Sequence, residues 1–231
     1  QMPTKPEGAN WNTPPTFIDQ MNYRGDGAGY FKSGNNQLFT LPISGGTPRQ
    51  LTFSDFDHGA PVWSKDGQSL FFSANMHKDE EFEPLNSEIF QIDLKSNAIK
   101  PLTSRYGPDG NPLVSPDGKK IAYVGFDDKH QGYQITDCYV MNTDGTDIKN
   151  LSKDFDRDVQ NIQWSKDGKG LYFQFDDQGK TKLGHISLSG KVSIKAENLG
   201  GLSLGRPYNE AQFSVSDKDQ FAYTLGTPEH P

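Results

Sequence analysis

The chain has 231 residues, which is enough for one large domain or two small ones. Its net charge of −7 disfavours nucleic acids and anionic membranes as partners, because both need a basic footprint. No apolar run approaches the roughly 18 residues of a membrane-spanning helix. The 24 glycines and 15 prolines indicate many short elements, and an aromatic content of 12 % indicates a chain that buries a core rather than a disordered one.

The beginning of the chain carries little patterned sequence. Residues 1–15 are expected to be an N-terminal extension, and no signal peptide is recognisable at Gln1. The single cysteine, Cys138, excludes an internal disulfide and a cysteine-rich metal site, and we expect it to be a small packed residue. One cysteine does not define the redox compartment, so the cytoplasm and the periplasm both stay open.

A motif of the form W-S-x-D-G recurs along the chain. Its copies begin at Trp63, Val114, Trp164 and, in a worn form, Val215, and their aspartates are spaced 51, 50 and 50 residues apart. A second landmark, leucine followed by threonine or serine, keeps the same period at 51–52, 102–103 and 151–152. Two landmarks that share one period identify an internal repeat.

Each repeat unit predicts four short strands. In the unit that starts at His58, the strands are expected at 61–64, 69–74, 88–94 and 99–103, and no segment of the chain shows a useful helical period. Asp66 and Gly67 supply the positive φ that a tight hairpin needs. Trp63 and Trp164 occupy matching repeat positions, which predicts that both pack in the core.

Tandem four-stranded units of roughly 40 to 50 residues describe a β-propeller. The predicted fold class is therefore all-β, a propeller of four-stranded antiparallel blades that forms part of a ring. We place the blades at about 16–57, 58–107, 108–156 and 157–200, with a partial fifth at 201–231, so that residues 16–231 form the propeller. Because an incomplete ring exposes the apolar faces of its end blades, we expect the isolated chain to self-associate.

The repeat units resemble the blades of the prolyl-oligopeptidase (S9) family of serine peptidases. The resemblance rests on 45–52, 63–67, 115–119 and 139–145, and the opening stretch 23–30 resembles the first blades of acylaminoacyl- and dipeptidyl-peptidase-like members. Tol-type periplasmic propellers share the blade motif.

The resemblance implies a division of labour within a longer protein. In this peptidase family, a propeller precedes an α/β-hydrolase domain that carries the catalytic serine, aspartate and histidine. The chain would then be a non-catalytic propeller that gates access and contributes to peptide binding for a hydrolase domain absent from it. The alternative is a Tol-like propeller that binds a protein or a peptide.

Loops at one end of the blades are predicted to carry binding residues, because loops on a rigid scaffold commonly do so. Connections between second and third strands are expected at 75–87, 126–136 and 176–182. The candidate substrate-binding residues are Glu80, Glu81, His58, Arg105, Arg157, Arg206 and Tyr208. Carboxylates could hold a cationic peptide N-terminus and arginines a carbonyl or a C-terminus, whereas the alternative is solvated loops with local salt bridges. The resemblance to dipeptidyl peptidases implies that Glu80 and Glu81, in the longest insertion, grip a substrate amine.

No catalytic residue, metal or cofactor is predicted within the chain. Residues 201–205 match the G-x-S-x-G pattern of a nucleophile elbow, but Pro207 does not suit the helix that must follow, and only His230 lies downstream. We therefore expect an inter-blade loop there, and peptidase chemistry only in the parent protein. The histidines lack metal-ligand spacing, and the aspartates of the repeated motif are expected to stabilise turns rather than bind calcium.

Overall fold

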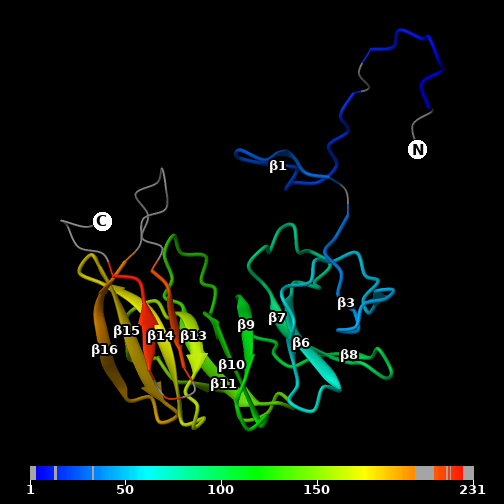
Figure 1. Ribbon diagram of the computed structural model, residues 1–231. Helices are drawn as coiled ribbons and strands as arrows, with labels where there is room; N and C mark the ends of the chain where they lie inside the picture. The colour runs from blue at the N-terminus through cyan, green and yellow to red at the C-terminus, as the bar shows by residue number, and fades with distance from the viewer. Residues whose placement is uncertain are drawn as a thin grey trace. The chain divides into compact units, whose positions relative to one another are not determined.

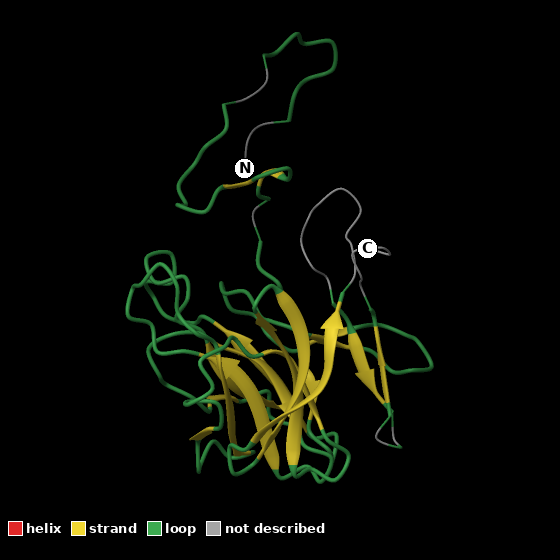
Figure 2. Cartoon of the chain, turned by 90° about the vertical axis from the view of Figure 1, so that its left-hand side faces the viewer, coloured by secondary structure: helices red, strands yellow, loops and turns green. Residues whose placement is uncertain are grey.

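The computed structural model describes residues 4–12, 15–32, 34–200, 211–216, 218 and 220–225. These residues form strands, turns and loops and no helix, so none of them makes a helix long and apolar enough to cross a membrane (Figure 2). The prediction of an all-β chain is confirmed. The chain divides into two compact units, Gln1–Gly34 and Asn35–Pro231, and each is described by itself.

The first unit contains one short antiparallel hairpin. Strand β1 (Arg24–Gly25) pairs with β2 (Gly29–Tyr30), and the rings of Tyr23 and Tyr30 stack with their centroids 6.2 Å apart. Gly27 lies in the turn with a φ of 73°, which glycine adopts without a steric penalty.

The second unit is a succession of antiparallel sheets, each made of strands that are neighbours in sequence (Figure 1). It begins with the pair β3 (Phe39–Thr40) and β4 (Arg49–Gln50) and ends, among the described residues, with the pair β17 (Phe213–Val215) and β18 (Phe221–Tyr223). Three four-stranded sheets lie between these pairs. Their strands are β5 (Val62–Trp63), β6 (Ser69–Ala74), β7 (Glu88–Asp93) and β8 (Ile99–Pro101); β9 (Asp109–Val114), β10 (Lys120–Gly125), β11 (Asp137–Asn142) and β12 (Lys149–Asn150); and β13 (Gln160–Trp164), β14 (Gly170–Asp177), β15 (Lys180–Ser187) and β16 (Val192–Leu199). The four strands predicted for the unit at 58 are confirmed as β5 to β8.

Successive sheets pack against one another in chain order. Strand β9 contacts β5, β6 and β7 of the preceding sheet, and β10 contacts β13 of the following one. Because each strand reverses direction, the loops between second and third strands and the connectors between sheets lie at the same end. We call this end the loop face; it comprises 75–87, 102–108, 126–136 and 151–159.

The third predicted loop, 176–182, is wrong. Strands β14 and β15 continue through most of it and are joined by a turn of two residues, Gln178 and Gly179, whose φ angles are 51° and 72°. Two consecutive positive φ angles match the right-handed twist of the flanking strands, so the hairpin closes without a loop.

The repeated serine–aspartate turns at the opposite end share one set of hydrogen bonds. In the first, Ser64 Oγ donates to Asp66 Oδ1 at 2.6 Å, and this oxygen also accepts from the amide of Gln68 at 3.0 Å. The equivalent bonds join Ser115, Asp117 and Lys119, and Ser165, Asp167 and Lys169. The serine hydroxyl, followed by the amide, holds the pKa of Asp66 below its ordinary value. The turn interpretation of these aspartates is confirmed.

The second landmark of the repeat also has a defined structural role. Thr103 Oγ1 accepts from the amide of Ile89 at 2.9 Å and donates to Glu88 Oε2 at 2.5 Å, so it ties the end of the fourth strand to the start of the third. The corresponding bonds join Ser152 to the amide of Cys138 and to Asp137, and Thr52 to the amide of Leu38. In each of these places the hydroxyl therefore satisfies a buried amide.

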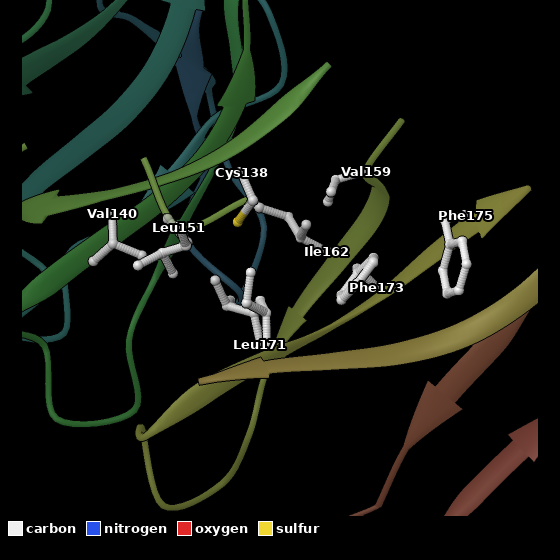
Figure 3. Packing of buried hydrophobic residues seen from close by; sticks show 10 residues of the cluster. Cys138, Val140, Leu151, Val159, Ile162, Leu171, Phe173 and Phe175 are labelled. Atoms are coloured by element: carbon white, nitrogen blue, oxygen red, sulfur yellow. The ribbon is translucent and has the colours of Figure 1, made fainter. Parts of the chain in front are cut away.

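The hydrophobic core lies between neighbouring sheets. Figure 3 shows Cys138 and Val140 of β11, together with Leu151, facing Leu171 and Phe173 of β14. Cys138 is fully buried, as predicted for a packed residue, and its burial raises the pKa of the thiol to about 12. Each sheet thus buries one face against the next, which is the way tandem units that cannot cover both faces alone become stable.

The two repeat tryptophans have different environments. Trp164 packs against this core and donates from Nε1 to the carbonyl oxygen of Leu113 at 2.9 Å, one sheet earlier in the chain. Trp63 is 55 % exposed, so its prediction as a core residue is wrong. Within the second unit, the sheet before Trp63 is only the pair β3–β4, which supplies no first strand for the indole to lie against.

Candidate functional site

The loop face is held together by hydrogen bonds between consecutive loops. The connector 102–108 lies between the loops of the two sheets that it joins. The amide of Gly107 donates to Asn86 Oδ1 at 3.1 Å on one side, and Tyr106 O accepts from the amide of Asp128 at 3.0 Å on the other. Hydrogen bonds of this kind connect consecutive loops of the loop face to one another.

Arg105, a predicted binding residue, lies in the connector 102–108 of the loop face. Its guanidinium forms an ion pair with Asp109, which is completely buried, and reaches Asp127 at 3.3 Å. The guanidinium carbon also lies 4.7 Å from the centre of the Tyr139 ring, within the range of a cation–π interaction. Burial raises the pKa of Asp109, and the charge of Arg105 opposes this rise. Arg105 is therefore occupied mainly in stabilising a buried carboxylate.

Arg157 lies in the next connector and makes a similar connection. It pairs with Asp177 at 2.9 Å and with Asp156 at 3.4 Å, and Asp177 is also held by Lys182 at 3.0 Å. Its side chain is 42 % exposed, against 21 % for Arg105. Both arginines thus join a connector to the sheet that follows it, but only Arg105 does so with a buried partner.

An aromatic bridge lies beside Arg105. The hydroxyl of Tyr106 donates to Glu83, and its ring meets that of His130 edge-on with centroids 5.7 Å apart. The carboxylate of Glu83 raises the pKa of the Tyr106 hydroxyl to about 12, because the phenolic proton is held in this bond. Tyr106 therefore connects the loop 75–87 to the loop 126–136.

A pocket of about 350 Å³ opens between the loop 75–87, the strands β7 and β8, and the connector 102–108. It is lined by Met76, His77, Asn86, Glu88, Phe90, Pro101, Thr103, Ser104, Arg105 and Tyr106. Glu88, the first residue of β7, is 5 % exposed. Burial raises the pKa of its carboxyl to about 7, with Asp109 adding to the rise and the hydrogen bond from Thr103 opposing it. A carboxyl that titrates near neutrality in a pocket is a functional-site candidate.

Three other predicted site residues, Glu80, Glu81 and His58, do not line this pocket. Glu80 is half-buried and Glu81 is exposed in the loop 75–87, and neither lines the pocket. His58 is 6 % exposed and packs on Phe72, with its Nδ1 2.9 Å from Asn36 O, so it lies in the protein interior. Arg206 and Tyr208 lie outside the described residues, as does the G-x-S-x-G pattern.

Glu88 and Asp109 are the site residues that sequence reasoning missed. A signal for Glu88 was present, because the repeat aligns Glu88 and Thr103 with Asp137 and Ser152, an acid and a hydroxyl at matching places. The burial that perturbs both acids comes from packing between sheets and has no signature in the sequence. Across the described part of the chain, no group of three or more histidine, cysteine, aspartate or glutamate side chains is arranged to hold a metal ion.

Comparison with known proteins identifies peptidases and propellers. No protein-family model matches the chain. Dipeptidyl-peptidase 5 of Porphyromonas gingivalis is 30 % identical over 135 residues, which are 56 % of this chain and 19 % of that protein. The chain thus spans only a small part of the length of this relative.

Solved structures share the fold. A puromycin-hydrolyzing peptidase of Mycobacterium tuberculosis superposes with a TM-score of 0.61 at 16 % identity, over 84 % of this chain and 32 % of that one. TolB of Acinetobacter baumannii superposes with a TM-score of 0.57 at 19 % identity, over 81 % of this chain and 42 % of that one. The expected resemblance to dipeptidyl-peptidase-like members of the prolyl-oligopeptidase family, and to Tol-type propellers, is confirmed: the chain is similar in sequence to dipeptidyl-peptidase 5 and shares its fold with a puromycin-hydrolyzing peptidase and with TolB.

Proposed function

We propose that the chain is the non-catalytic propeller of a prolyl-oligopeptidase-like serine peptidase. In this proposal it gates access to, and helps to bind peptides for, an α/β-hydrolase domain elsewhere in the parent protein. The observation that carries the proposal is the sequence similarity to dipeptidyl-peptidase 5, in a chain that folds into repeated four-stranded sheets. The sheets would be the blades, at about 58–107, 108–156 and 157–200, with 16–57 and 201–231 contributing to two more.

The loop face supports a role in gating. Tyr106 and Arg105 join its loops through a hydrogen bond and an ion pair, and loops held together in this way would restrict which substrates pass. It also carries more carboxylates than cations around the pocket, which suits a positively charged ligand. Relatives that are several times longer than the matched region leave room for the hydrolase domain.

The decisive experiment uses the complete reading frame that encodes this chain. We expect the full protein to hydrolyse dipeptidyl-aminomethylcoumarin substrates and to lose this activity with a serine-directed phosphonate, whereas the 231-residue chain alone does neither. Replacing 78–86 in the full protein with a short glycine–serine linker should raise the hydrolysis of longer peptides relative to dipeptide substrates. An unchanged ratio would argue against gating.

A Tol-like module that binds a protein or a peptide is the second candidate. It is favoured by the structural likeness to TolB, whose TM-score of 0.57 is close to the 0.61 of the puromycin-hydrolyzing peptidase. A complete reading frame that encodes no hydrolase segment, together with a full protein that cleaves no peptide, would select this candidate and refute the first.

A further inference from the structure

The pocket beside β7 exposes a carboxylate oxygen that the protein does not use. Glu88 Oε2 accepts the hydroxyl of Thr103, but Oε1 receives no hydrogen bond from the described part of the chain. The imidazole Nε2 of His77 lies 4.0 Å from Oε1, beyond hydrogen-bond distance. Because Glu88 lines the pocket, a donor that enters the pocket can bond to this oxygen.

The charges around Glu88 favour a cationic donor. The groups that face it are His77 from the loop after β6, Arg105 from the connector after β8, Asp109 from β9 and Tyr123 from β10. The single guanidinium is already paired with Asp109 and with a second aspartate. When Glu88 is ionised, the carboxylates therefore outnumber the cations, and a ligand with one positive charge is attracted.

The walls of the pocket select the shape of that ligand. Met76, Phe90 and Pro101 contribute apolar surface to the pocket that Glu88 also lines, and this surface suits an alkyl chain. The polar backbone that carries a peptide α-amine would lose its hydrogen bonds against such walls. A guanidinium prefers to bind both oxygens of a carboxylate, whereas only Oε1 of Glu88 is free.

We infer that this pocket is a binding site for a primary alkylammonium group, with Glu88 Oε1 as its acceptor and Met76, Phe90 and Pro101 around its alkyl chain. The ligand is either a lysine side chain of a polypeptide or a free alkyl amine. The inference stands on the pocket and does not require that the chain serve a peptidase.

Binding of an ammonium group is linked to the protonation of the carboxylate. Because burial raises the pKa of Glu88 to about 7, the acceptor is charged above neutrality and neutral below it. Affinity should therefore fall as the pH is lowered from 8 to 5. A cation held at ordinary exposed carboxylates would keep its affinity over most of this range.

The test is a titration of the 231-residue chain with two matched probes at pH 8, in which binding is measured by calorimetry and by NMR. Acetyl-lysine methylamide carries only a side-chain ammonium, and norleucine methylamide carries only an α-ammonium on a similar alkyl chain. We expect the lysine probe to bind at least tenfold more tightly than the norleucine probe and than acetyl-arginine methylamide. Adding 1,5-diaminopentane in a separate arm tells a free amine from a polypeptide side chain as the preferred source.

Two variants and one further measurement locate the binding. Glu88→Gln keeps the acceptor for Thr103 and should weaken the lysine probe at least tenfold. Asp137→Asn is the matched control, because both oxygens of Asp137 already accept bonds, from Ser152 at 2.6 Å and Asn150 at 2.7 Å, and it should change nothing. The wild-type pH titration needs no variant. Equal binding by Glu88→Gln, affinity independent of pH, or equal binding of the lysine and norleucine probes would each overturn the inference.

Discussion

Removing Arg105 should destabilise the protein far more than removing Arg157, although both join a connector to the following sheet. Arg105→Ala leaves Asp109 buried with no cation beside it, and breaking a buried pair in this way costs about 3–5 kcal/mol. Because the Arg105 side chain is 21 % exposed, we expect about 3 kcal/mol. Arg157→Ala leaves Asp177 with Lys182 at 3.0 Å, so only a small loss of stability is expected.

The assay is urea denaturation at pH 8. Unfolding is monitored by tryptophan fluorescence and by far-ultraviolet circular dichroism, so that the two transitions can be compared. Without Arg105, no cation opposes the effect of burial on Asp109 and the pKa of Asp109 rises further, so protonation at pH 5 should shrink the deficit of Arg105→Ala. The combination Arg105→Met with Asp109→Leu should recover most of the lost stability, since it removes both charges. A deficit equal to that of Arg157→Ala, or one that grows at pH 5, would refute the reasoning.

Three further outcomes follow from single contacts. The folded state holds a proton on Glu88 up to about pH 7, whereas the unfolded group releases it near pH 4.5. The free energy of unfolding should therefore fall as the pH rises from 4.5 to 7. In urea melts at several pH values, Glu88→Gln should flatten this slope. Trp164→Phe should lower stability by about 1 kcal/mol, since its indole donates to the preceding sheet, while Trp63→Phe at an exposed site should change little in the same melts; equal effects would contradict the packing described. Gly107→Ala should cost about 3 kcal/mol in thermal or urea unfolding, because the φ of Gly107 is 135° and an added Cβ meets backbone atoms of the loop 126–136. Gly110→Ala is the control, because a Cβ added there meets no atom within 4 Å.

The sequence predicted the sheets well because their signals are local. The serine, aspartate and glycine of each turn lie within a few residues, and their hydrogen bonds are made within the same hairpin. The turn residues Asp66 and Gly67 therefore placed β6 at its observed bounds. The error at 176–182 also arises from the local signal, because glutamine is not a residue type that predicts a two-residue turn with positive φ, and Gln178 occupies such a turn.

The site was less predictable because it depends on contacts between sheets. Charge and loop position identified Arg105, but the burial of its partner Asp109 comes from packing of β9 against the preceding sheet. His58 has the chemistry of a binding residue, and only the fold shows that Phe72 and Asn36 surround it. Side-chain chemistry is legible in a sequence, whereas exposure is a property of the assembled sheets.

The two ends of the sheets differ in how freely they can change over evolutionary time. At one end, each two-strand reversal is fixed by a serine and an aspartate that satisfy each other, so an inserted residue there would break several bonds at once. At the other end, loops of quite different length, from 75–87 down to the pair Gln178 and Gly179, join equivalent strands. Since the entropy of closing a loop grows only slowly with its length, new recognition segments can be grafted at that end while the scaffold beneath them is preserved.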